Sequence, residues 1–214
     1  MILPVGSINR HAAGLAAATV GWILAVTSMG LVAWRVWHMD SSPGFPSGLA
    51  CVGMWRVCIY HHVPVGRVPF CHPYSHHDAF LPPDILAAQH LLLAASILGL
   101  LGKAAVLLAL RNVFTGILQE NAAFGPFVTS GILYLLASAC LSATVVLNYA
   151  SVTREQRISF PPSFYLPDRP DAQEVGNASH LATVAALLLL LSGVSSFSHR
   201  YPRDRQVHPD MSEL

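Results

Sequence analysis

The chain has 214 residues, of which 53% are hydrophobic and only 11% are charged. A soluble domain carries about 25% charged residues, so this composition argues against a soluble globular domain. The formal net charge is +1 and the basic residues are thinly spread, which excludes a phosphate-tracking surface for nucleic acid. The sequence holds no Gly-rich phosphate loop, nucleophile elbow or zinc-protease motif, so we predict neither an enzyme nor a cofactor.

The apolar residues gather in four runs. A helix needs about twenty residues to cross a ~30 Å hydrocarbon core, and its backbone groups must bond internally there. We therefore predict a membrane α-helical protein with transmembrane helices at 12–32, 85–110, 127–147 and 180–197. A soluble bundle is the alternative, but four such runs leave too little polar surface to dissolve it. The first run lacks a clear cleavage site and continues into Trp34, so we interpret it as a retained span.

Four spans place both termini on one side of the membrane. Lys and Arg close to span ends favour the cytoplasm, and Arg200, Arg203 and Arg205 follow the fourth run directly. Three cysteines lie between the first two runs, and disulfides persist in oxidising compartments. Asn177 begins a glycosylation sequon on the same side as these cysteines. We therefore predict cytoplasmic segments at 1–11, 111–126 and 198–214, and extracellular loops at 33–84 and 148–179.

The first extracellular loop has the composition of a small β-sheet. Residues 48–71 are rich in β-branched and aromatic side chains, and the Pro-Val-Gly-Arg segment at 64–67 is a turn signal. A bridge between Cys58 and Cys71 would staple this hairpin and contribute about 3 kcal/mol in the chain-entropy model. A sheet of two or three strands has little core of its own, so such a staple is physically reasonable.

Three tryptophans flank or enter this hairpin. Trp34 and Trp37 are explained by the enrichment of tryptophan at membrane interfaces. Trp55 lies in the strand region, and we expect it to anchor the sheet to the tops of the helices.

The order of Trp34, Gly53-Met54-Trp55, Cys58 and Cys71 resembles the claudin family. Claudins carry a Trp after the first span, then a Gly-Leu-Trp step, then two cysteines that form a disulfide. The segments at 81–88 and 174–176, and Gly102-Lys103, also resemble claudin segments, so the likeness covers nearly the whole chain. The resemblance implies a left-handed four-helix transmembrane bundle capped by a small extracellular antiparallel β-sheet. It also implies side-by-side polymerisation and head-to-head adhesion between cells.

The chain departs from the family pattern at several positions. Gln89-His90 stands where claudins usually carry an arginine, and Cys51 is an additional loop cysteine. The membrane-proximal cysteines that many claudins palmitoylate are absent, since Ala104 follows Lys103 and the segment after the fourth run has no cysteine. Lost acyl chains weaken lateral anchoring. Within the family, the sequence is most like the divergent claudin-34 type.

Six of the eleven histidines lie in the first loop. The fixed charges of this loop nearly cancel, with Arg35, Arg56 and Arg67 set against Asp40 and Asp78. Since an imidazole titrates near ~6.5, the loop is expected to turn cationic in mild acid and to favour anions if it lines a pore. The residues proposed for this pH response are His61, His62, His72, His76 and His77. A zinc site is the alternative, but the spacing matches no zinc module, so no metal site is predicted.

The second loop and the tail carry two further motifs. Phe160, Pro161, Pro162 and Phe164 form a stiff turn. The turn is either an exposed adhesion contact or a linker whose phenylalanines pack on the first loop's sheet. Ser212, Glu213 and Leu214 end the chain in a pattern that fits a PDZ groove.

These features predict an adhesive structural protein of tight junctions at the plasma membrane. Its expected partners are identical chains or other claudins in cis and in trans, a PDZ scaffold and the lipid bilayer. The alternative function is an accessory subunit of a channel or receptor, because one fold serves several functions.

Overall fold

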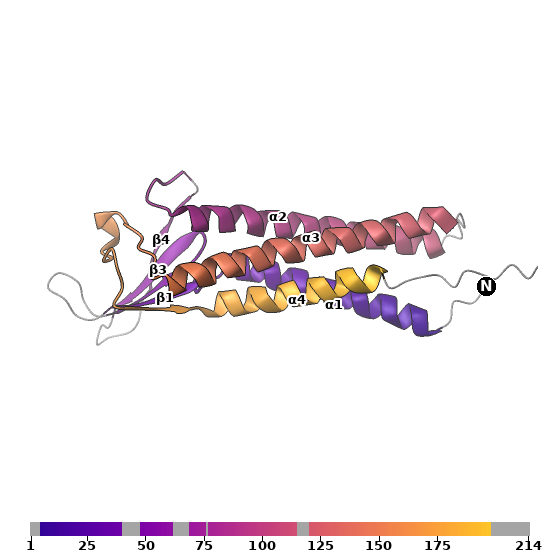
Figure 1. Ribbon diagram of the computed structural model, residues 1–214, viewed down its shortest axis with the longest axis horizontal. Coiled ribbons are helices and arrows are strands. Elements are labelled where there is room, and N and C mark those ends of the chain that lie inside the picture. The colour runs from indigo at the N-terminus through magenta and orange to yellow at the C-terminus, as the bar shows by residue number, and fades with distance from the viewer. Residues whose placement is uncertain (1–4, 40–47, 62–68, 76, 115–119, 198–214) are drawn as a thin grey trace, which may run out of the picture.

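The computed structural model describes residues 5–39, 48–61, 69–75, 77–114 and 120–197. Four long helices run side by side, and a small sheet caps one end of them (Figure 1). The helices are α1 (Val5–Gly30), α2 (Pro83–Phe114), α3 (Glu120–Thr153) and α4 (Asn177–Phe197). Each contains a stretch long and apolar enough to cross a membrane, so the predicted fold class of four membrane-crossing helices is confirmed.

The helices are longer than the apolar runs that predicted them. α2 begins at Pro83 and α3 continues to Thr153, beyond the expected limits of 85 and 147. Hydropathy marks only the part of a helix that lies in hydrocarbon, whereas backbone hydrogen bonding continues into the polar region. Pro83 and Asp84 fit the first turn of α2, where proline loses no hydrogen bond and an acidic side chain meets the positive end of the helix dipole.

Small residues allow the helices to approach closely. A Cβ atom on Gly99 would lie 2.6 Å from the Trp22 ring, and one on Gly102 would lie 2.7 Å from the Tyr134 ring. Large apolar side chains cover the outside of the bundle, among them Ile97, Leu107, Val146 and Leu191. An apolar exterior of this extent fits a bilayer rather than water.

The cap is a five-stranded antiparallel sheet in the order β4-β3-β2-β1-β5. Its strands are β1 (Arg35–Met39), β2 (Gly48–Val52), β3 (Arg56–His61), β4 (Phe70–Pro73) and β5 (Ala172–Val175). The two or three strands expected at 48–71 are present as β2, β3 and β4, but the sheet also contains β1 and β5. β1 was missed because Trp37 within it and Trp34 just before it were attributed to the membrane interface. β5 was missed because a four-residue polar strand has no clear periodic signal.

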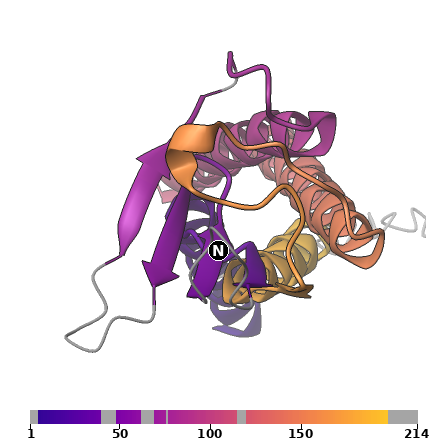
Figure 2. The ribbon, with the colours of Figure 1, turned by 90° about the vertical axis from the view of Figure 1, so that its left-hand side faces the viewer.

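The fifth strand joins the second loop to the first. β5 pairs with β1, and beyond it Gly176 N donates to Trp34 O (2.9 Å) while Ala178 N donates to Ala33 O (2.9 Å). Viewed along the bundle, the sheet lies to one side and the second loop arches across the end of the helices (Figure 2). Both loops therefore build one structure.

Candidate functional site

The inner face of the sheet is built on tryptophans and alternating strand residues. Trp34 and Trp37 are fully buried, so the interpretation of both as interfacial tryptophans was wrong. Trp34 Nε1 donates to Ser28 O (2.9 Å), which ties the start of β1 to the end of α1. Arg35, Trp37 and Met39 share the buried face of β1, because alternate residues of a strand point the same way.

The Gly53-Met54-Trp55 step turns the chain from β2 into β3 against the end of α1. A Cβ atom on Gly53 would lie 2.9 Å from Val32 Cα and 3.0 Å from Arg56 O, so only glycine allows this approach. Met54 is buried, and its carbonyl accepts a hydrogen bond from Gln89 Nε2 (2.6 Å). Gln89, which stands in place of the family's usual arginine, thus fixes the step to α2.

Tyr74, directly after β4, holds the same step from the neighbouring strand. Its hydroxyl donates to Gly53 O, and its backbone N donates to Trp55 O (3.0 Å). Burial raises the pKa of the Tyr74 phenol, so the hydroxyl stays protonated and remains a donor at any physiological pH. The Gly53-Met54-Trp55 turn is therefore held by polar contacts from Gln89 and from Tyr74.

A buried polar network joins β1 to two helices. The Arg35 side chain is 2% exposed and forms an ion pair with Asp84 at the start of α2. Arg35 Nε donates to Asn148 Oδ1 (3.0 Å), and Asn148 Nδ2 donates to Trp34 O (3.1 Å). The Ser151 hydroxyl also donates to Asp84. Sequence reasoning missed this network and counted Arg35 as a free loop charge, although Asp84 lies within the segment at 81–88 that resembles the family.

A disulfide joins Cys58 of β3 to Cys71 of β4, the bridge expected from the sequence. The two residues lie opposite each other in adjacent strands, with Cα atoms 4.1 Å apart. β4 is an edge strand, so the bridge holds an element that has only one neighbouring strand. Cys51 of β2 is a buried free thiol.

The phenylalanines of the second loop pack inward. Phe160 is only 6% exposed and lies edge-on to Trp37, with ring centroids 5.6 Å apart. Phe164 stacks on His72 of β4 at 4.1 Å, and Phe80 lies 5.8 Å from both phenylalanines. Phe160 and Phe164 therefore do not form the exposed contact that was one of the two expectations.

The outer surface of this turn consists of the residues beside the phenylalanines. Pro162, which opens the short 3-10 helix η1 (Pro162–Phe164), is exposed, and Pro161 is half-buried. Tyr165 follows with 68% of its side chain exposed and a left-handed backbone at φ 52°. A non-glycine residue rarely adopts this conformation, so the surrounding turn determines how Tyr165 is presented. Sequence reasoning missed Tyr165.

The predicted histidine cluster is described only in part. His72 is half-buried, His77 is exposed, and His38 lies 3.8 Å from Glu174 across the sheet. The side chain of His61 and all of His62 and His76 lie outside the described residues.

Two other predicted motifs are the glycosylation sequon and the PDZ motif at the end of the chain. Asn177 of the sequon is the exposed first residue of α4, and its glycosylation stays a prediction. The terminal Ser212, Glu213 and Leu214 lie outside the described residues, so the PDZ motif also stays a prediction.

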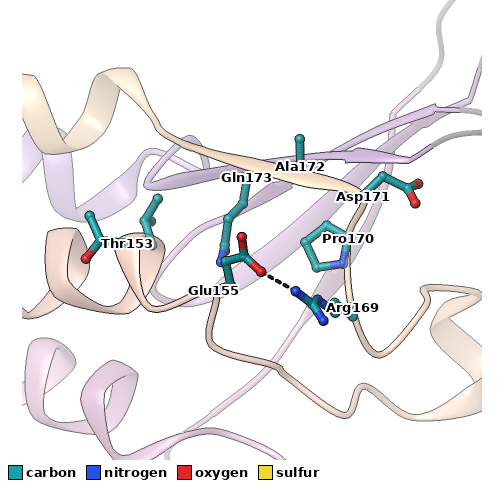
Figure 3. Close-up of a pocket in the computed structure, with 8 residues that line it drawn as sticks. Thr153, Glu155, Arg169, Pro170, Asp171, Ala172 and Gln173 are labelled. Carbon is teal, nitrogen blue, oxygen red and sulfur yellow. Dashed lines mark hydrogen bonds and ion pairs between the residues drawn. The ribbon is translucent and has the colours of Figure 1, made fainter.

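A shallow pocket of about 240 Å³ lies between the end of α3 and β5 (Figure 3). Arg169 and Glu155 form an ion pair at its edge, and both side chains are more than half exposed. Exposed pairs of this kind contribute only about 0–1 kcal/mol. None of the residues predicted to be functional lines this pocket.

The fold and the cap define a four-span membrane protein whose two loops contribute strands to a single sheet at one end of the bundle. A family model described as PMP-22/EMP/MP20/Claudin tight junction matches residues 19–195. Two relatives, Claudin-4 of Canis lupus familiaris and Claudin-4 of Bos taurus, are each 27% identical over 192 residues. The match covers 88% of this chain and 85% of each relative. The chain belongs to the PMP-22/EMP/MP20/Claudin tight junction family.

Proposed function

We propose that the protein is a claudin-like adhesion protein of tight junctions, assembling in cis and in trans to shape the paracellular barrier or its permeability. The observation that carries this function is the cap, in which both loops join one disulfide-linked sheet on a four-span bundle. Similarity to Claudin-4 over 88% of the chain supports the claudin branch of a family whose description also names PMP-22, EMP and MP20. Fold alone would not separate these branches.

The finer assignments follow from this function. We place the protein in the plasma membrane at cell–cell contacts, with identical chains or other claudins as its lateral and opposing partners. Ser212-Glu213-Leu214 is the proposed contact for a PDZ scaffold. Within the family, the proposed assignment is the divergent claudin-34 type, which the sequence as a whole resembles most. The proposed role is structural, so no enzymatic activity is assigned.

In fibroblasts that lack tight junctions, we expect a tagged form to gather where two expressing cells touch. Adhesion in trans requires the protein on both cells, so contacts between an expressing and a non-expressing cell should show no enrichment. Fluorescence at the contact relative to free membrane is the measurement. Uniform distribution in cells that carry the protein at their surface would contradict adhesion and favour an accessory subunit of a channel or receptor.

Tyr165→Ala tests which surface makes the contact. Tyr165 is exposed on the second-loop turn, so its removal should leave the fold and surface expression intact while it lowers enrichment at contacts. Tyr149→Ala is the matched control, because the Tyr149 side chain is also largely exposed but lies on α3 within its apolar stretch. Equal enrichment of both variants and the unmodified protein would exclude Tyr165 as a contact residue.

If the cap lines a paracellular pore, acidification should shift permeability toward anions. Arg35 is neutralised by Asp84, so the first loop retains two fixed cations, Arg56 and Arg67, against two fixed anions, Asp40 and Asp78. The histidines then decide any change in net charge as the pH falls past about 6.5. Dilution potentials across expressing epithelial layers at pH 7.4 and pH 6 measure this change. Potentials that do not change between the two would contradict the pH response.

A further inference from the structure

The first loop contains a third cysteine that the proposed function does not use. β2 and β3 pair with Cys51 opposite Cys58, and β3 and β4 pair with Cys58 opposite Cys71. Residues directly opposite each other in an antiparallel sheet project from the same face. The three cysteines therefore form one row across three neighbouring strands, with Cys58 in the middle.

The hydrogen-bond pattern sets the spacing in this row. Gly53 N donates to Arg56 O (2.9 Å), so this opposed pair is hydrogen-bonded. Cys51 and Cys58 lie two residues further along the two strands and form the next pair of that type. Hydrogen-bonded pairs have Cα atoms about 5.5 Å apart, and a disulfide accepts about 4.4–6.8 Å. The Cα spacing of the Cys51–Cys58 pair therefore lies within the disulfide range, and a bridge requires only that the two Cβ atoms approach slightly.

We propose that Cys51, Cys58 and Cys71 form a thiol–disulfide exchange site that switches the bridge between two neighbouring strand pairs. The Cys51 thiol gives its proton to solvent, and the thiolate attacks Cys58 Sγ. The Cys51–Cys58 bond forms as the Cys58–Cys71 bond breaks, and Cys71 leaves as a thiolate that takes a proton from solvent. One S–S bond replaces another, so the step consumes no oxidant or reductant.

The exchange changes which thiol faces the outside. Cys51 is only 7% exposed, whereas Cys71 is exposed on the edge strand β4. The switch therefore converts a protected thiol into one open to modification by disulfides in solution. It also removes the covalent link that holds β4, the strand whose His72 stacks on Phe164 of the second loop. A redox-sensitive connection between the two loops follows from this arrangement.

The pH dependence of the exchange has a definite sign. Burial raises the pKa of the Cys51 thiol, so the attacking thiolate is scarce at neutral pH. The thiolate fraction grows as the pH rises, and the exchange should accelerate with it.

Labelling of intact cells with a membrane-impermeant maleimide tests the exchange in the full chain. After labelling at pH 7.4 and pH 8.5, digestion by trypsin without reduction cuts at Arg56 and Arg67, so the three cysteines fall on different peptides. We expect maleimide on Cys71 together with a linked Cys51–Cys58 peptide pair, both increasing at the higher pH. Absence of that linked pair, or Cys71 labelling that always accompanies Cys51 labelling, would overturn the proposal.

Two substitutions separate exchange from simple reduction of the bridge. Cys51→Ser should keep the Cys58–Cys71 link and reduce Cys71 labelling to background, whereas labelling equal to the unmodified protein would overturn the proposal. Cys71→Ser should yield a Cys51–Cys58 link, and maleimide on both Cys51 and Cys58 would overturn the proposal. Cys140→Ser is the matched control, since Cys140 lies in α3 away from the cap and its removal should change neither result.

Discussion

Arg35→Leu is expected to lower the free energy of unfolding by about 3–5 kcal/mol, the usual cost of removing one partner from a buried ion pair. Leucine leaves the Asp84 carboxylate without its cation and Asn148 Oδ1 without its donor. Because the Arg35 side chain is 2% exposed, water cannot replace the lost contacts without opening the cap. Thermal unfolding of the purified protein in detergent, together with the fraction that reaches the cell surface, measures the loss.

Arg169→Leu is the matched control for this substitution. Arg169 forms an ion pair with Glu155, but both side chains are more than half exposed. Solvent screens such a pair, and its removal should cost about 0–1 kcal/mol. If the two variants lost the same stability, the Arg35 network would not be the connection between β1 and the helices that the structure indicates.

The double variant Arg35→Leu, Asp84→Leu distinguishes the unpaired charge from the loss of packing. Replacing both members of a buried pair with apolar residues is often neutral or stabilising, because no isolated charge remains. We therefore expect the double variant to be more stable than Arg35→Leu alone. A double variant with the summed losses of its two single variants would instead show that the two side chains act independently.

The parts of the fold that sequence could predict are those with local signals. Helices follow from continuous apolar runs, and the β2–β3–β4 part of the sheet follows from β-branched residues between turn signals. The disulfide follows from its place in that hairpin and from the family resemblance. Each of these features is encoded within a short stretch of chain.

The features that escaped prediction depend on contacts between distant segments. Arg35 bonds to a residue 113 positions away, and β5 finds its partner strand only after the second loop has returned to the first. Neither contact leaves a periodic pattern in the sequence. The turn at Phe160 illustrates the same limit, because an aromatic pair beside two prolines fits both an exposed contact and a packed cover. Only the ring contacts of Phe160 with Trp37 and of Phe164 with His72 show that the turn packs on the sheet.

The junction between β5 and α4 should tolerate no side chain at Gly176. A Cβ atom there would lie 2.1 Å from Ala33 O and 2.5 Å from Ala33 C, which are backbone atoms that no side-chain rotation can move. Gly176→Ala must therefore push the two chain segments apart. The shift would strain the hydrogen bonds that run from Gly176 N to Trp34 O and from Ala178 N to Ala33 O. We expect a loss at the upper end of the range for overpacking, about 3 kcal/mol or more.

Gly30→Ala provides the comparison that makes this loss specific. Gly30 ends α1 at the same end of the bundle, and a Cβ atom there meets nothing within 4 Å. The two substitutions add the same methyl group, so a difference in unfolding temperature well beyond the ~1 kcal/mol helix-propensity effect at Gly30 reports the contact with Ala33. Similar unfolding temperatures would mean that the backbone at Gly176 is not packed against the backbone at Ala33. A large difference would show that this glycine is what allows the second loop to close onto β1 and complete the sheet.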